Sequence, residues 1–102
     1  MISTETARQS YARVSAITAI PVDDLLSDGK SRQLIYARGL VARDMARAGA
    51  DLKSICRRMG ISSDAVRRNM ARVEMEMLQN FDLAYADASL RLNPLAPPSI
   101  EA

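Results

Sequence analysis

Residues 52–73 read Leu-Lys-Ser-Ile-Cys-Arg-Arg-Met-Gly-Ile-Ser-Ser-Asp-Ala-Val-Arg-Arg-Asn-Met-Ala-Arg-Val. Apolar residues recur at helical spacing through the first part of this stretch: Leu52, Ile55, Cys56 and Met59. Gly60 then supplies a residue that tolerates the positive φ of a tight turn. Ser62 is a preferred residue type for capping a second helix. The stretch therefore predicts two helices joined by a sharp turn, with Cys56 as the small residue at their interface.

The second helix has an apolar stripe and a basic outer face. Its stripe comprises Val66, Met70, Val73, Met77 and Phe81. When Ile61 and this stripe pack inward, the early positions left outside are Ser63, Asp64, Arg67 and Arg68. Such a pair of helices is typical of the helix-turn-helix, which lays its second helix in the major groove of DNA. The competing interpretation is an amphipathic hairpin whose arginines are simply solvated.

Each exposed polar residue of this pair has a candidate contact with DNA. Arg67 and Arg68 are candidates for bidentate contacts with guanine. Asp64 either accepts a hydrogen bond from a cytosine amine or simply caps the helix. Phosphate contacts are expected at the helix N-terminus and from the basic side chains. The remaining candidates on the two helices are Lys53, Arg57, Arg58, Ser62, Ser63 and Arg72.

The net charge of +2 conceals an uneven distribution. The segment 30–72 holds eleven basic residues and three acidic ones, whereas the rest of the chain holds three basic and nine acidic residues. A basic centre between acidic ends indicates a polyanionic partner for the centre. The alternative is a solvated surface rich in arginine, of the kind that a GC-rich genome encodes, since Arg outnumbers Lys 12 to 2.

Composition limits the other possibilities. The 102 residues fit one domain, and the scarcity of aromatic residues favours a helical core over strands. Cys56 is the single cysteine, which indicates a reducing compartment, and neither a membrane-spanning run nor a secretory signal is present. We expect a cytoplasmic, nucleoid-associated protein. The chain has no His, no Gly-rich phosphate loop and no clustered metal ligands, so we expect neither an enzyme nor a cofactor.

Outside the central stretch, the chain divides into three parts. Residues 1–20 are expected to be partly helical or flexible, with Thr4 or Thr6 capping a short helix. That helix would bury Tyr11, Val14 and Ile17. Residues 21–92 form the predicted DNA-binding domain, and residues 93–102, which contain three prolines, are expected to be a flexible tail.

The predicted domain contains further helices. Pro21 opens a short helix that carries Asp23 and Asp24 in its first turn. A longer helix starts at Ser31 and has the stripe Leu34, Ala37, Val41, Met45 and Ala48. Gly49 is placed to end that helix, and Asp51 to cap the next one. The last helix either continues to Leu92 or breaks at 80–82 and restarts with Asp82 as its cap.

These residues resemble a known family. Val22-Asp-Asp-Leu-Leu-Ser27, Lys30-Ser31-Arg32, the Ala-rich helix, Leu52 with Ile55, and Gly60 with Val66 are similar to the C-terminal DNA-binding domain of the replication initiator DnaA. The resemblance covers residues 22 to about 75. It implies an all-α bundle containing a helix-turn-helix, with Lys30, Ser31 and Arg32 as a basic loop in the minor groove. It also places Arg67 and Arg68 on the recognition helix.

The chain departs from that family at two places. Ser62-Ser63-Asp64-Ala65 stands where DnaA has Asp-His-Thr-Thr, and Asp28-Gly29 replaces basic residues, so recognition of the DnaA box does not carry over. The DnaA ATPase module is absent, because the chain has no Walker sequence. A stand-alone domain of this size is similar to the DNA-binding activators of alphaproteobacterial gene transfer agents.

The resulting functional hypothesis is a sequence-specific transcription regulator that binds double-stranded DNA, and the resemblance favours an activator. The acidic and apolar segment 74–85 either folds back on the core or contacts RNA polymerase or a second regulatory subunit. A homodimer is a further option, and no membrane partner is expected. The alternatives are a protein-interaction adaptor and a replication-linked DNA-binding accessory protein.

Overall fold

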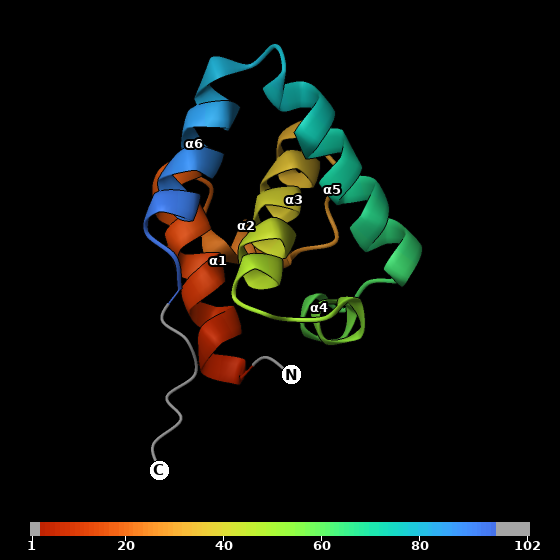
Figure 1. The fold of residues 1–102 in the computed structure, drawn as a ribbon. Helices are drawn as coiled ribbons and strands as arrows, with labels where there is room; N and C mark the ends of the chain where they lie inside the picture. The colour runs from red at the N-terminus through yellow and green to blue at the C-terminus, as the bar shows by residue number, and fades with distance from the viewer. Residues whose placement is uncertain (1–2, 96–102) are drawn as a thin grey trace.

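Six α-helices follow one another along residues 3–95, the part of the chain that the computed structural model describes. They are α1 (Thr4–Thr18), α2 (Val22–Leu26), α3 (Arg32–Arg47), α4 (Leu52–Met59), α5 (Ser63–Met77) and α6 (Phe81–Leu92). Figure 1 shows α3 in the middle, with α1 and α6 on one side, α5 on the other and α4 below the C-terminal end of α3. The expected all-helical fold class is confirmed.

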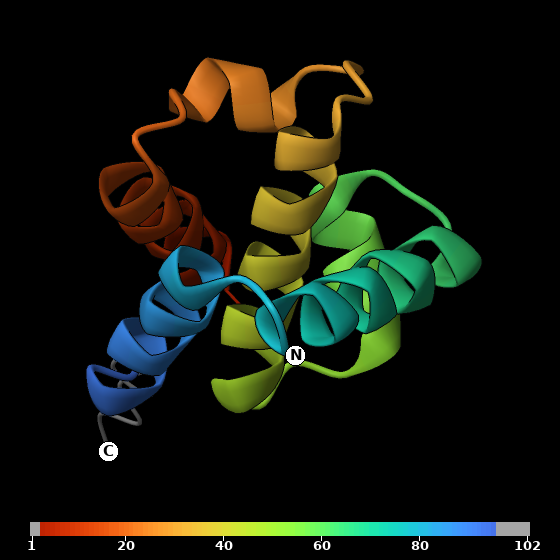
Figure 2. The ribbon, with the colours of Figure 1, turned by 90° about the horizontal axis from the view of Figure 1, so that it is seen from above.

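The N-terminal helix belongs to the same core as the other helices. In α1, Tyr11 and Val14 are buried, as expected, whereas Ile17 is 39% exposed and lies outside the core. Ser3, rather than Thr4 or Thr6, is the N-cap, because its side chain accepts a hydrogen bond from the backbone N–H of Thr6. Figure 2 shows α2 bridging from α1 to α3, so the start of the chain is tied to the centre of the bundle.

The predicted helix ends around α4 are confirmed in detail. Gly49 has a φ of +99° directly after the C-cap of α3, a conformation that favours glycine. The Asp51 carboxylate accepts a 2.8 Å hydrogen bond from the Ser54 N–H, and this bond holds the pKa of Asp51 below its ordinary value. Ser62 caps α5 in the same way, by accepting from the N–H of Ala65.

The turn between α4 and α5 is tight, because the two backbone N–H groups that follow Met59 donate to the same carbonyl oxygen. Gly60 has a φ of +69°, and the N–H groups of Gly60 and Ile61 both donate to the carbonyl oxygen of Cys56. Val66 is fully buried one turn into α5, and Ile55 of α4 is buried beside it in the same core. Cys56 itself is only half-buried.

The end of α5 corrects one sequence prediction. The helix stops at Met77, and α6 starts at Phe81 with Asn80, not Asp82, as its N-cap. Phe81 was expected in the apolar stripe but is 81% exposed. The reason is that the chain turns at residues 78–80, so Phe81 opens a new helix and is no longer in line with Val73.

In the middle of the molecule, α3 and α5 cross in close contact at Gly39. A Cβ added at Gly39 would lie 2.6 Å from the backbone oxygen of Asn69 and 3.0 Å from the Cβ of Val73. No side chain larger than hydrogen fits at this crossing, so glycine lets the two helix backbones approach. The crossing fixes the position of α5 relative to the loop that precedes α3.

The C-terminal end of the described chain packs on the bundle. The tail predicted over residues 93–102 lies outside the described residues from 96 onward, while Leu95 is buried against the bundle. Within residues 3–95, no helix combines the length and apolar character needed to cross a bilayer.

Candidate nucleic-acid interface

Three of the eleven basic residues in segment 30–72 are bound to other parts of the molecule. Arg38 is the first. Its guanidinium donates to four backbone carbonyls in and after α2, those of Asp24, Leu25, Ser27 and Gly29. Because these carbonyls lie on the chain leading to Lys30, Arg38 fixes the shape of the loop before α3.

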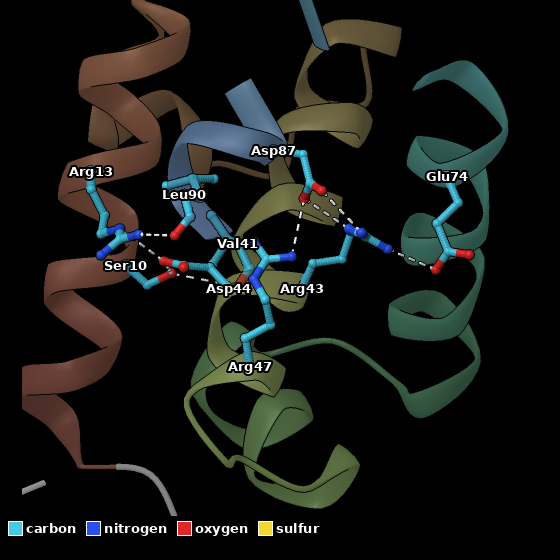
Figure 3. Close-up of polar contacts among 9 residues, drawn as sticks. All are labelled: Ser10, Arg13, Val41, Arg43, Asp44, Arg47, Glu74, Asp87 and Leu90. Atoms are coloured by element: carbon cyan, nitrogen blue, oxygen red, sulfur yellow. Dashed lines mark hydrogen bonds and ion pairs between the residues drawn. The ribbon is translucent and has the colours of Figure 1, made fainter. Parts of the chain in front are cut away.

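Arg43 and Arg47 are the other two, and both bind Asp87 of α6 (Figure 3). The Nε and Nη2 of Arg43 lie 2.9 Å and 3.0 Å from the two carboxylate oxygens, while its Nη1 lies 3.0 Å from Glu74 of α5. Burial alone would raise the pKa of Asp87, but the hydrogen bonds and charges of both arginines outweigh it and lower that pKa. This cluster joins α3, α5 and α6.

A second buried carboxylate lies close to this cluster. Asp44 accepts a 2.9 Å hydrogen bond from Ser10 and lies 3.3 Å from the Nε of Arg13, both on α1 (Figure 3). Burial raises the pKa of Asp44, and the Ser10 hydrogen bond and Arg13 charge offset this only partly. Sequence reasoning missed Asp44, although it occupies a position in the apolar stripe of α3 between Val41 and Met45.

The other eight basic residues of segment 30–72 are all exposed, and all eight were predicted to contact DNA. They are Lys30, Arg32, Lys53, Arg57, Arg58, Arg67, Arg68 and Arg72. The structure therefore separates three arginines that are bound to carboxylates or backbone carbonyls of other helices and loops from these eight exposed residues. Composition alone could not make this distinction.

Four of the outer residues come together in one groove. Lys30 and Arg32, from the start of α3, line it on one side, and Arg68 and Arg72, from α5, line it on the other. We call this the basic groove. Figure 1 shows the two walls as neighbouring segments, since α3 and α5 pack along each other. Lys53, Arg57 and Arg58 lie apart from it, on α4.

The far end of the basic groove has a different character. Met75, Glu76 and Gln79 line it, and the hydroxyl of Tyr36 donates a 3.2 Å hydrogen bond to the Glu76 carboxylate. Sequence reasoning assigned no role to Tyr36, because residues forty positions apart give no local signal of their contact. The groove therefore changes from basic to acidic and apolar along α5.

The serines expected to hold phosphates serve first as helix caps. The hydroxyl oxygens of Ser31 and Ser62 accept from the N–H groups of Leu34 and Ala65. Each hydroxyl retains its proton, so it can still donate to an anion. Ser63 is exposed in the first turn of α5, next to Ser62.

The two adjacent arginines of α5 have different surroundings. The Nη1 of Arg67 lies 3.7 Å from an oxygen of Asp64, and both side chains are largely exposed. Arg68 lines the basic groove, whereas Arg67 does not. Asp64 lies in the first turn of α5, where the helix dipole favours an acid.

An apolar surface lies where α5 meets α6. Four large side chains there are exposed, namely Met75, Leu78, Phe81 and Tyr85, and the rings of the last two stack with centroids 6.5 Å apart. We call this the apolar platform. The rest of α6 folds back on the core through Ala86 and Leu90. Segment 74–85 therefore packs on the core in part, through Met77 and Leu83, and leaves these four side chains exposed.

Comparison with protein-family models, with curated proteins and with solved structures finds no match to this chain. Conclusions on function must therefore come from the residues themselves.

Proposed function

We propose that this chain is a sequence-specific transcription regulator that binds double-stranded DNA through a helix-turn-helix. In this proposal α4 and α5 form the motif, α5 lies in the major groove, and the loop carrying Lys30 enters the adjacent minor groove. The observation that carries the proposal is the basic groove, which puts Lys30 and Arg32 opposite Arg68 and Arg72. The resemblance to the DNA-binding domain of DnaA agrees with this arrangement.

Electrostatics support a polyanionic partner. The eight exposed basic residues that were predicted to contact DNA lie on α4, on α5, at the start of α3 and in the loop before it. Arg43 and Arg47 are instead paired with carboxylates inside the bundle, and Arg38 is bound to backbone carbonyls. A side chain that neutralises a phosphate releases a condensed counterion, so such a surface gains affinity for a duplex at low salt. Capped helix starts at Ser31 and Ser62 add N–H groups that favour phosphate.

A second candidate function, a protein-interaction adaptor, is favoured by one observation. The apolar platform exposes two stacked aromatic rings and two long aliphatic side chains on one end of the bundle. Exposed aromatic residues of this kind are enriched at protein interfaces. In a DNA-binding activator, the platform would serve as the contact with RNA polymerase, a second regulatory subunit or a second copy of the chain.

The experiment that tests DNA binding is a salt series. Fluorescence anisotropy of a labelled random-sequence duplex, titrated with the protein at about 50–300 mM salt, gives the slope of log Kobs against log salt. We expect a slope of about −0.9 for each phosphate neutralised. Arg57→Ala should weaken binding to all duplexes to a similar degree and make the slope shallower by about 0.9.

Arg8→Ala is the matched control. Arg8 is an exposed arginine of α1, paired with Glu5, on the other side of the bundle from α5. Its loss should leave both affinity and slope at the wild-type values. Absence of binding to any duplex, or a slope near zero, would reject the proposal and favour the adaptor.

A further inference from the structure

We infer that Arg68, and not its neighbour Arg67, is the residue of α5 that determines sequence specificity. The inference rests on the proposed function, which leaves the two arginines equivalent. It assigns them different roles, with Arg68 contacting a base edge and Arg67 making no base contact. Arg72 acts beside Arg68 as a contact to phosphate.

Helix geometry separates the two side chains. Val66 and Val73 are both fully buried and mark the side of α5 that faces the core. Successive residues of an α-helix are about 100° apart, so Arg68 projects about 200° from Val66, almost directly away from the core. Arg67 projects about 100° from Val66, toward one flank. A helix that lies in a groove presents the residue opposite its buried side most deeply.

The basic groove gives a second, independent argument. Arg68 shares the groove with Lys30 and Arg32, whereas Arg67 does not line it. A duplex that touches both α5 and the loop before α3 must lie on the Arg68 side of the helix. Arg72 follows one turn later on that same side, closer to the acidic end at Glu76.

The chemistry of the two environments agrees with this assignment. An arginine that makes a bidentate contact with guanine uses two N–H groups of its guanidinium, one for the O6 atom and one for the N7 atom. The Nη1 of Arg67 lies 3.7 Å from Asp64, a carboxylate that would compete with the base for the same donors. No ion pair with a carboxylate is found for Arg68 within the described part of the chain, and Arg68 lines the groove.

The test is a binding selection from a random duplex library, in which the target sequence emerges from the selection itself. Wild type, Arg67→Ala, Arg68→Ala and Arg68→Lys are each carried through the same rounds, and the enriched sequences are compared. Circular dichroism checks that each variant is folded, which we expect because both side chains are exposed.

We expect wild type and Arg67→Ala to enrich the same motif. Arg68→Ala should lose its preference at one or two base pairs, with discrimination there falling about 5- to 150-fold. Arg68→Lys should retain most of the affinity for random duplex but show the same loss of discrimination, because a lysine cannot make the bidentate contact.

The outcomes separate the inference from the proposed function. Loss of the motif in Arg67→Ala, or an unchanged motif in Arg68→Ala, overturns the inference while DNA binding stands. A wild-type protein that binds duplexes but enriches no motif also overturns it. A wild-type protein that binds no duplex rejects the proposed function itself.

Discussion

Gly39→Ala tests whether the contact between α3 and α5 holds the molecule together as the structure shows. Gly39 is buried in the middle of α3, and a new Cβ would lie 2.6 Å from the backbone oxygen of Asn69. Ordinary contact begins at 3.4 Å, so the two helices must separate locally by about 0.8 Å. Neither a backbone carbonyl nor the branched Cβ of Val73 can rotate out of the way.

The sign of the change in the free energy of unfolding is what makes Gly39→Ala informative. In an exposed helix, replacing Gly by Ala stabilises by about 1 kcal/mol. Overpacking a core costs about 1–3 kcal/mol, and a rigid obstacle such as the Asn69 carbonyl demands the upper part of that range. We therefore expect the free energy of unfolding to fall by about 1–2 kcal/mol, which lowers the Tm by about 4–8 °C for each kcal/mol.

Urea and thermal unfolding followed by circular dichroism measure this change. Ala12→Gly, at an exposed position of α1, gives the helix-propensity difference in the same protein, with an expected loss of about 1 kcal/mol. If Gly39→Ala is as stable as wild type or more stable, the helices are farther apart than described, and the position of α5 relative to the basic loop is wrong. If the crossing in the wild type is as described, Gly39→Ala should also bind duplex DNA more weakly at temperatures where it remains folded, because Lys30 and Arg68 move apart.

Three further substitutions test other parts of the structure. Asp87→Asn should lower the free energy of unfolding at pH 7 by about 2–3 kcal/mol, because Arg43 and Arg47 lose their anionic partner. The pKa of Asp87 is lower in the folded protein than its unfolded value of 3.8, so its ionised carboxylate stabilises the fold above pH 3.8. This stabilisation disappears as the pH falls through the folded pKa. Urea titrations at about pH 7 and about pH 2.5 should therefore show the difference in unfolding free energy between wild type and Asp87→Asn shrinking at the lower pH. Arg38→Ala should weaken duplex binding with an unchanged salt slope, because Arg38 holds carbonyls of the loop and touches no phosphate; a slope shallower by about 0.9 in the anisotropy series would contradict this role. Ser62→Ala should cost about 1 kcal/mol in thermal unfolding and Ser63→Ala close to nothing, and equal losses would show that Ser62 is not the cap.

Sequence reasoning succeeded for most interactions that span one helical turn. The cap at Ser62, the stop at Gly49 and the turn at Gly60 all depend on bonds between residues three to five positions apart. Residue type and spacing carry that information directly. The starts of α1 and α6 were the exceptions, because neighbouring residues of capping type compete there: Ser3 with Thr4 and Thr6, and Asn80 with Asp82.

The sequence predicted which residues belong to the candidate interface, but not how these residues are arranged in space. All eight basic residues that were predicted to contact DNA are exposed, as expected for polar residues opposite an apolar stripe. Their grouping required the fold. Lys30 and Arg68 share a groove only because Gly39 lets α3 and α5 approach, and no spacing along the chain encodes that crossing.

Periodicity and local hydrogen bonding in the sequence were enough to predict most of the helices, the caps at Asp51 and Ser62, and most of the buried faces, because these depend on residues within a turn of one another. Which arginines bind carboxylates of other helices depends instead on how the helices pack. Arg43 and Arg47 look like Arg57 in the sequence, yet both bind Asp87, forty or more residues away. A periodic pattern tells which side of a helix is buried, but not which partner it meets there, since that depends on how separate helices pack in space.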